Sequence, residues 1–292
     1  MQTRVWGAAA ALALLAGSAA AQSRVEERRP AAPDGLVQID NPAGSTRVVG
    51  WDRPEILVTG TLGAGAEGLT FEATKRRADI GVETEGNPHS AAADLEIKVP
   101  AGSRVEIESF NATIDVSGIK GSLKADTVQG RIVITASTGE VEADAVNGSI
   151  EISGAPKRVH AESVNGAVTI SGASGEVQAS TVNGRLAVSG GSFERVGLET
   201  VNGRVSFEGE LRSGADLSAE SVGGSVELRL PARTSAEFTV ATFSGEVRND
   251  FGPAAKPANR WTSEKELSFT VGNGSAKVNI ETLSGDIEIR KQ

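Results

Sequence analysis

The sequence predicts an all-β protein: a single parallel β-solenoid (β-helix) of coils about 18 residues long with an irregular β N-terminal part. Three observations support this prediction. A Val-Asn-Gly tripeptide recurs at a nearly constant interval, apolar and polar residues alternate on both sides of each copy, and glycine accounts for 35 of 292 residues. Alternation over short runs bounded by Asn and Gly is typical of half-buried strands joined by tight turns.

The chain begins with the features of a secretory signal. Arg4 precedes an apolar run from Ala8 to Leu15, and the small residues Ala19–Ala21 follow as a cleavage site, so the mature chain is expected to start at Gln22. The apolar run is shorter than the roughly 20 residues that a membrane-spanning helix needs. We therefore expect residues 1–21 to be a cleaved signal peptide, and the protein to be periplasmic or secreted to the cell surface with no transmembrane segment.

The rest of the chain divides into a leader and one domain. Residues 22–35 contain two prolines and several charges, which predict a flexible leader. Residues 36–292 are expected to form the β-solenoid domain. Within it, residues 36–100 are irregular and predict the first coils or a cap, whereas residues 101–292 carry regular repeats, interrupted by a proline-rich insertion at 252–265. The charged final residues are expected to protect the last strand edge from aggregation.

The repeat fits two architectures. The tripeptides Val146-Asn147-Gly148, Val164-Asn165-Gly166 and Val182-Asn183-Gly184 are 18 residues apart, and Val201-Asn202-Gly203 follows after 19. Asn-Gly between alternating runs is a strong hairpin signal, so a series of hairpins is one architecture. Hairpins give no reason for one residue type to recur at each equivalent position. In a solenoid each residue packs on its copies in neighbouring coils, about 4.8 Å away, and we therefore predict the solenoid.

The corners of the coils lead to three predictions. The asparagines are expected to form a ladder of side-chain amides hydrogen-bonded in series; they are Asn147, Asn165, Asn183 and Asn202. The following glycines are expected to adopt positive φ; they are Gly148, Gly166, Gly184 and Gly203. The valines before the asparagines are expected to form an internal column, so Val164→Asp should unfold the protein, whereas Glu162→Ser should be nearly neutral.

Outward positions just before the corners carry acidic side chains. These residues are Asp126, Asp144, Glu162, Glu199 and Glu220, with Ser180 interrupting the series. Stacked one strand spacing apart, they form a stripe that is either a solvated face or a site for a divalent cation such as Ca²⁺, which takes oxygen ligands. The solvated face is favoured, because no single cluster converges and the calcium-binding nonapeptide of other β-solenoids is absent.

Composition excludes several classes of function. The chain has no cysteine, which excludes disulfides, thiolate metal sites and cysteine nucleophiles. His89 and His160 are the two histidines, and each is expected to be an ordinary exposed residue. A net charge of −9 disfavours nucleic acid as a partner. The stretch Gly63–Gly68 matches a dinucleotide-binding pattern, but strand-like residues follow where that motif needs a helix. No catalytic residue and no cofactor is predicted.

The chain resembles a family of exported bacterial adhesin-like proteins with β-strand repeats, itself of unknown function. The resemblance rests on the Val-Asn-Gly corners, on Asp94–Gly102 before the first regular coil and on the closing Glu281–Ile289, and it covers residues 36–292. It implies a parallel β-solenoid in the cell envelope and brings no catalytic residues with it.

Together these features predict a non-catalytic binding, adhesion-like or scaffolding surface whose partner is an unidentified envelope protein or glycan. Two alternatives are kept. One is a polysaccharide-active β-helix enzyme, in which carboxylates on one face perform acid–base chemistry. The other is a structural module stabilised by a bound cation.

Overall fold

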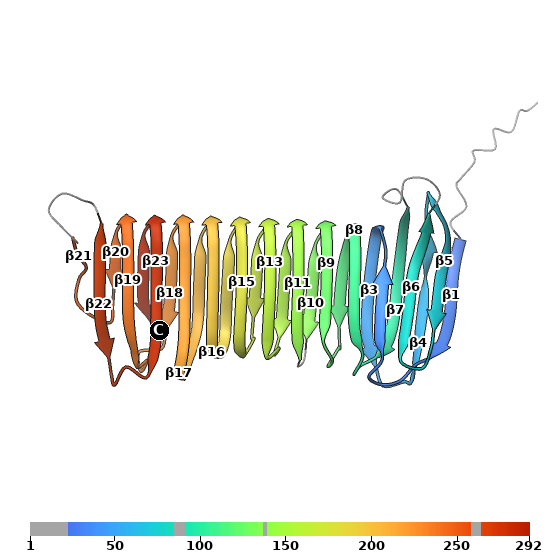
Figure 1. The fold of residues 1–292 in the computed structure, drawn as a ribbon, viewed down its shortest axis with the longest axis horizontal. Helices are drawn as coiled ribbons and strands as arrows, with labels where there is room; N and C mark the ends of the chain where they lie inside the picture. Colours follow the sequence, from blue (N-terminus) through green and yellow to red (C-terminus); the bar gives the residue numbers. More distant parts are fainter. Residues whose placement is uncertain (1–22, 85–90, 137–138, 258–263) are drawn as a thin grey trace, which may run out of the picture.

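The structure is an elongated rod made of stacked strands (Figure 1). It is a computed structural model that describes residues 23–84, 91–136, 139–257 and 264–292, and these form 24 strands and no helix. The all-β solenoid predicted from the sequence is therefore confirmed. The expected signal peptide and His89 lie outside the described residues.

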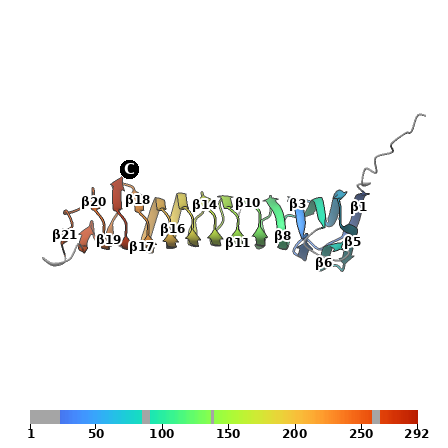
Figure 2. The same cartoon turned by 90° about the horizontal axis from the view of Figure 1, so that it is seen from above.

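Each regular coil contributes two strands that lie on opposite sides of one core. In one coil, β13 (Arg158–Asn165) precedes the Asn-Gly corner and β14 (Val168–Ser171) follows it. Strands before the corners form the first layer of the rod and strands after them form the second layer (Figure 2). The other strands of the regular coils are β8 (Arg104–Ser117), β9 (Leu123–Gln129), β10 (Ile132–Ala136), β11 (Glu140–Asn147), β12 (Ile150–Gly154), β15 (Gly175–Asn183), β16 (Leu186–Asn202), β17 (Val205–Gly223) and β18 (Val226–Leu230). Strand β8 runs through a corner, and β16 and β17 run through the turn at the other end of the coil, so all three belong to both layers.

Neighbouring coils pair as parallel strands, in register with the sequence repeat. Ala161 of β13 pairs with Ala143 of β11 on one side and with Ala179 of β15 on the other. In the second layer, Ile152 of β12 pairs in the same way with Ile134 and with Ile170. Equivalent residues of successive coils thus lie directly over one another, which confirms the solenoid against the series of hairpins.

The core lies between the two layers and is filled by the inward half of each alternating run. Val159 and Ala161 of the first layer and Val168 and Ile170 of the second are at most 1 % exposed. A single coil buries too few such side chains to offset the entropy of ordering its residues, so the coils are stable only as a stack.

The valines of the corners lie outside this core, so the predicted internal column is wrong. Val164 is 42 % exposed, and its equivalents in the neighbouring coils are exposed to a similar degree. The cause is the two-residue period of a strand: Ser163 points inward, and its neighbour Val164 must therefore point outward. The inward position suits a hydroxyl, because Ser163 Oγ donates a hydrogen bond to the Gly148 carbonyl at 3.1 Å, and Thr181 Oγ1 donates to the Gly166 carbonyl in the same way.

The predicted asparagine ladder is confirmed. Asn165 Nδ2 donates to Asn147 Oδ1 at 2.9 Å, Asn183 donates to Asn165 at 2.9 Å, and Asn202 donates to Asn183 at 3.0 Å. The ladder stops at the next coil because Gly223 stands opposite Asn202.

The glycines that follow these asparagines are required for a reason other than the predicted one. Positive φ is absent at Gly148, Gly166, Gly184 and Gly203, so that prediction is wrong. Instead, each glycine lies against the backbone of the preceding coil. A Cβ on Gly203 would lie 1.7 Å from the carbonyl oxygen of Gly184, far inside van der Waals contact. Any side chain at these corners would therefore push two coils apart.

Irregular pairing closes the N-terminal end of the rod. The strands of this part are β1 (Ser23–Pro30), β2 (Leu36–Asp40), β3 (Ala43–Trp51), β4 (Glu55–Leu62), β5 (Ala66–Ala73), β6 (Arg77–Thr84) and β7 (Ala92–Pro100). Strands β2 and β3 form the first coil and pair in parallel with β8. On their other side β2 and β3 pair in parallel with β6 and β7. Beyond these strands the pairing becomes antiparallel, between β4 and β7 and between β5 and β6. The division of the domain at residue 100 stays a prediction.

The leader expected at residues 22–35 is largely a strand. All eight residues of β1 pair antiparallel with β4. Most of the charges that suggested a flexible leader lie on this strand. Arg29 contacts Glu27 at 2.8 Å, and the Arg29 guanidinium also lies over the Phe71 ring. Charged side chains on an edge strand oppose further strand addition, which is consistent with a strand that ends the sheet.

The C-terminal end does not stack in chain order. Its strands are β19 (Ala236–Ser244), β20 (Val247–Asn249), β21 (Lys256–Pro257), β22 (Lys265–Val271), β23 (Ala276–Ser284) and β24 (Ile287–Lys291). Strand β23 lies between β17 and β19, and β24 lies between β18 and β20. The charged final residues, Arg290 and Lys291, are thus part of an interior strand of the sheet, and the expectation that they protect its edge is wrong. That end is formed by β22, which pairs antiparallel with β19, and by the two-residue β21, which pairs antiparallel with β22.

Candidate binding surface

A row of carboxylates runs along the outer face of the first layer, one per coil over most of the rod. This acidic row consists of Asp40, Glu108, Asp126, Asp144, Glu162, Glu199, Glu220 and Glu281, with Ser180 between Glu162 and Glu199. All five acidic residues singled out in the sequence belong to it. Strand pairing places neighbouring members about 4.8 Å apart.

Beside the acidic row, two residues further along each strand, runs a row of exposed apolar side chains. This apolar row consists of the half-buried Val128 and the exposed Val146, Val164, Val182, Val201, Val222, Leu283 and Phe243. Its exposure increases toward the C-terminal end, where Leu283 and Phe243 are each 55 % exposed. Large apolar side chains in a continuous exposed row are a feature of interaction surfaces rather than of an ordinary solvated face.

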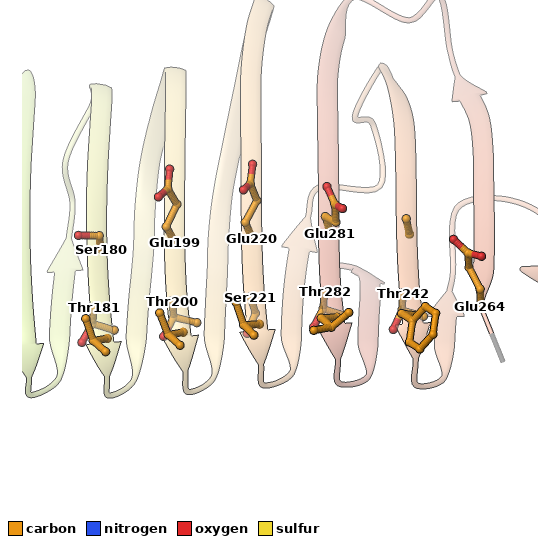
Figure 3. A pocket seen from close by; sticks show the side chains of 16 residues that line it. Ser180, Thr181, Glu199, Thr200, Glu220, Ser221, Thr242, Glu264, Glu281 and Thr282 are labelled. Atoms are coloured by element: carbon orange, nitrogen blue, oxygen red, sulfur yellow. The ribbon is translucent and has the colours of Figure 1, made fainter. Parts of the chain in front are cut away.

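The two rows border a shallow groove along the rod. Its N-terminal half, which includes Asp126 and Asp144, has a volume of about 600 Å³. Its C-terminal half has a volume of about 660 Å³ and includes Glu199, Glu220 and Glu281 along one side. In Figure 3 these three glutamates extend in a line on consecutive strands, with Thr200, Ser221 and Thr282 nearer the corners. Both halves include Ser180 and Val182, so the groove is continuous.

The two halves of the groove differ in charge. In the N-terminal half, Lys124 contacts Glu142 and lies 3.7 Å from Asp126, and His160 Nε2 lies 3.1 Å from Glu162. In the C-terminal half, four carboxylates border the groove and none has an ion-pair partner among the described residues; they are Glu199, Glu220, Glu264 and Glu281. This half therefore carries uncompensated negative charge beside its most exposed apolar side chains.

Burial and mutual repulsion raise pKa values within the acidic row. The pKa of Asp144 lies above its ordinary value, first because the carboxyl group is partly buried and then because the Glu162 carboxylate is close. Partial burial also raises the pKa of Asp126, against the opposing effect of Lys124. The Oδ1 atoms of both aspartates are buried and accept no hydrogen bond from the described residues. Ionisation of either carboxyl group is thus less favourable in the folded protein than in water.

Neutralising Asp144 is therefore expected to stabilise the protein at neutral pH. Because its pKa is raised on folding, the folded state holds the proton more tightly, and stability falls as pH rises from about 4 through the raised pKa. Asp144→Asn should raise the melting temperature at pH 7, and the gain should disappear near pH 3.5, where the wild-type carboxyl group is largely protonated. Glu151→Gln, on an exposed position of the second layer, is the control. An Asp144→Asn protein that melts below wild type at pH 7 would contradict this account.

Asp144 and Glu162 of the groove could share a cation with the neighbouring His160. Asp144, His160 and Glu162 each bring one ligand atom within 4.8 Å of the others. No sequence motif points to His160; it joins this cluster because it pairs opposite Glu142 and stands two residues before Glu162. The calcium interpretation of the acidic stripe stays a prediction.

The sequence did not indicate three members of the acidic row, and it predicted the valines of the apolar row to be buried although they are exposed. Asp40, Glu108 and Glu281 belong to less regular coils, where the corner tripeptide differs from Val-Asn-Gly. The signal for the apolar row was present: a residue directly after an inward Ser or Thr must face outward, whatever its hydrophobicity.

A protein-family model, described as Toastrack DUF4097, matches residues 86–290. The search of curated proteins found no match. No helix among the described residues is long and apolar enough to cross a membrane.

Solved structures of similar proteins come from several bacteria. A candidate cell adhesion protein from Clostridium sporogenes is 12 % identical over 92 % of this chain and 100 % of its own, with a TM-score of 0.24. Candidate adhesins from Bacteroides fragilis and Parabacteroides distasonis are 8 % and 10 % identical, each over 91 % of this chain and 97 % of its own, with TM-scores of 0.37 and 0.38. Similarity this weak transfers no activity from those proteins to this chain.

The family match spans the end of the N-terminal cap and the regular coils through β24, and it agrees with the family resemblance seen in the sequence. The chain, a β-solenoid with a repeated Val-Asn-Gly corner, belongs to the Toastrack DUF4097 family.

Proposed function

We propose that the protein is a non-catalytic binding scaffold of the cell envelope, exported by its N-terminal signal, and that the groove between the acidic and apolar rows is its binding surface. The observation that carries the proposal is the apolar row. Exposed valines recur at one position of five consecutive coils, from Val146 to Val222, although this position contributes nothing to the core. A surface that served only solubility would carry polar residues there.

A capture experiment tests the proposal. The groove variant carries Glu199→Gln, Glu220→Gln and Glu281→Gln, and the control variant carries Glu151→Gln, Glu208→Gln and Glu237→Gln, three exposed glutamates outside the groove. The two variants have equal net charge. We expect wild type and the control variant to retain the same envelope component, protein or glycan, and the groove variant to lose it. Equal capture by all three proteins would exclude the groove as the binding surface.

The polysaccharide-active enzyme is tested separately, because the acidic row also offers paired carboxylates. We expect no cleavage of a panel of glycans, with or without Ca²⁺. If wild type cleaves a glycan and Asp144→Ala does not, the protein is a glycan-cleaving enzyme and the non-catalytic scaffold is rejected.

A cation-stabilised module is the second candidate function, and the cluster of Asp144, His160 and Glu162 favours it. If a cation offsets the repulsion within the acidic row, millimolar Ca²⁺ should raise the melting temperature of wild type and raise that of Asp144→Asn less. Identical melting of wild type in Ca²⁺ and in chelator would exclude this candidate for calcium.

A further inference from the structure

We propose that the C-terminal half of the groove binds a cationic amphipathic helix of a partner protein, laid along the axis of the rod. The inference rests on the proposed binding function and names the chemistry of the partner. Apolar side chains of the helix would pack on Val201, Val222, Leu283 and Phe243, and its lysines or arginines would face the glutamates on the other side of the groove.

Charge selects a cationic partner. Glu199, Glu220 and Glu281 lie on three neighbouring strands, and Glu264 stands at the end of the groove beyond Thr242 (Figure 3). No lysine or arginine of the described residues forms an ion pair with any of the four. Carboxylates stacked about 4.8 Å apart repel one another, so a ligand that brings positive charge to several of them at once relieves this repulsion.

The apolar row selects a partner that is amphipathic as well as cationic. A polyamine or a simple cation would satisfy the glutamates and leave the apolar row in water. Leu283 and Phe243 are each 55 % exposed, and covering such side chains is favourable by about 25 cal/mol per Å² of apolar surface removed from water. A partner with one apolar stripe and one basic stripe matches both sides of the groove.

The spacing of the coils selects a helix over an extended segment. Side chains on one face of an α-helix repeat about every 5.4 Å, against about 4.8 Å between coils, so the mismatch over four coils is about 2 Å, within reach of flexible lysine and arginine side chains. An extended peptide repeats its side chains about every 6.6 Å. Its backbone groups would also lack partners on this face, because the backbone of the rod is already paired within the sheet, whereas a helix satisfies its own.

A second copy of this chain is a poor occupant of the same groove. The chain carries a net charge of −9, and every charged side chain bordering the C-terminal half of the groove is a glutamate. Two copies joined through this face would bring their acidic rows together, and like charges brought together oppose association.

The test measures binding of a designed peptide to the whole protein. The peptide is a labelled 14-residue chain of leucines and lysines arranged with leucine at helical spacing, and its control is a scrambled peptide of the same composition. Fluorescence anisotropy should show the amphipathic peptide binding at least about tenfold more tightly than the scrambled one. Because the described part of the protein is all β, a helical circular dichroism signal that appears on mixing reports the peptide.

Variants assign the binding to the groove. The groove variant, and separately a protein with Val201→Ser and Val222→Ser, should each bind the amphipathic peptide at least about tenfold more weakly than wild type, whereas the control variant should bind it as wild type does. Equal affinity for the scrambled peptide, binding without helix formation, or unchanged affinity in the groove variant would each overturn the inference. So would dimerisation of the wild type that the groove variant abolishes. If wild type does not bind the peptide but still captures an envelope component through the groove, the helical partner is rejected and the proposed binding function remains.

Discussion

Ile170→Asp is expected to unfold the protein or to reduce its stability by at least about 4 kcal/mol, because it places an unpaired charge inside the core. Ile170 is 0 % exposed and stacks between Ile152 and Val188 of the adjoining coils. In a stack whose coils depend on their neighbours, disruption of one coil also removes support from the next. Urea denaturation followed by circular dichroism, or loss of soluble protein, measures the effect.

Val164→Asp is the matched control, six residues away in the same coil. Val164 is 42 % exposed, so the new carboxylate stays in water, and we expect a change within about 1 kcal/mol, including repulsion from Glu162. The sequence alone predicted unfolding for this substitution. A Val164→Asp protein as unstable as Ile170→Asp would show that the corner valines face the core after all.

The second large effect is expected at a corner glycine. In Gly203→Ala the new methyl group would lie 1.7 Å from the carbonyl oxygen of Gly184 and 2.8 Å from its carbonyl carbon. Both are backbone atoms of the neighbouring coil, so they cannot move aside without breaking strand pairing. We expect a loss of about 3 kcal/mol or more in the free energy of unfolding, at the upper end of overpacking effects.

Gly197→Ala provides the comparison within β16, the strand that ends just before Gly203. A Cβ at Gly197 would meet only the flexible Gln178 side chain, at 3.9 Å, and the backbone there has no positive φ. Reduced entropy of the unfolded chain should leave this variant as stable as wild type or slightly more stable. If the Gly203→Ala and Gly197→Ala proteins had the same melting temperature, close packing of neighbouring coils would not explain why the corners carry glycine.

The repeat sufficed to predict the architecture because each of its residues makes the same contact in every coil. The asparagine ladder illustrates this: one side chain per coil, at a fixed position, has only its own copies to bond to. Parallel pairing and an 18-residue offset follow from the same regularity.

The inward and outward faces at the corners were harder to predict, because hydrophobicity and burial disagree there. Ser163 is 4 % exposed while Val164 is 42 % exposed, the reverse of their polarity. A carbonyl oxygen inside the corner compensates the serine, and this acceptor exists only once the preceding coil is in place. Likewise the groove depends on which strands become neighbours, and Leu283 joins Val222 there because β23 lies beside β17.

The position of β23 and β24 has a consequence for the order of assembly. These strands follow β19 and β20 in the chain, yet they fill the space between β17–β18 and the coil of β19 and β20. The coil of β19 and β20 therefore cannot join the stack of regular coils until β23 and β24 are in place. A chain interrupted before Ala276 would leave β17 and β19 without the strand that joins them, so completion of the C-terminal half of the groove depends on β23.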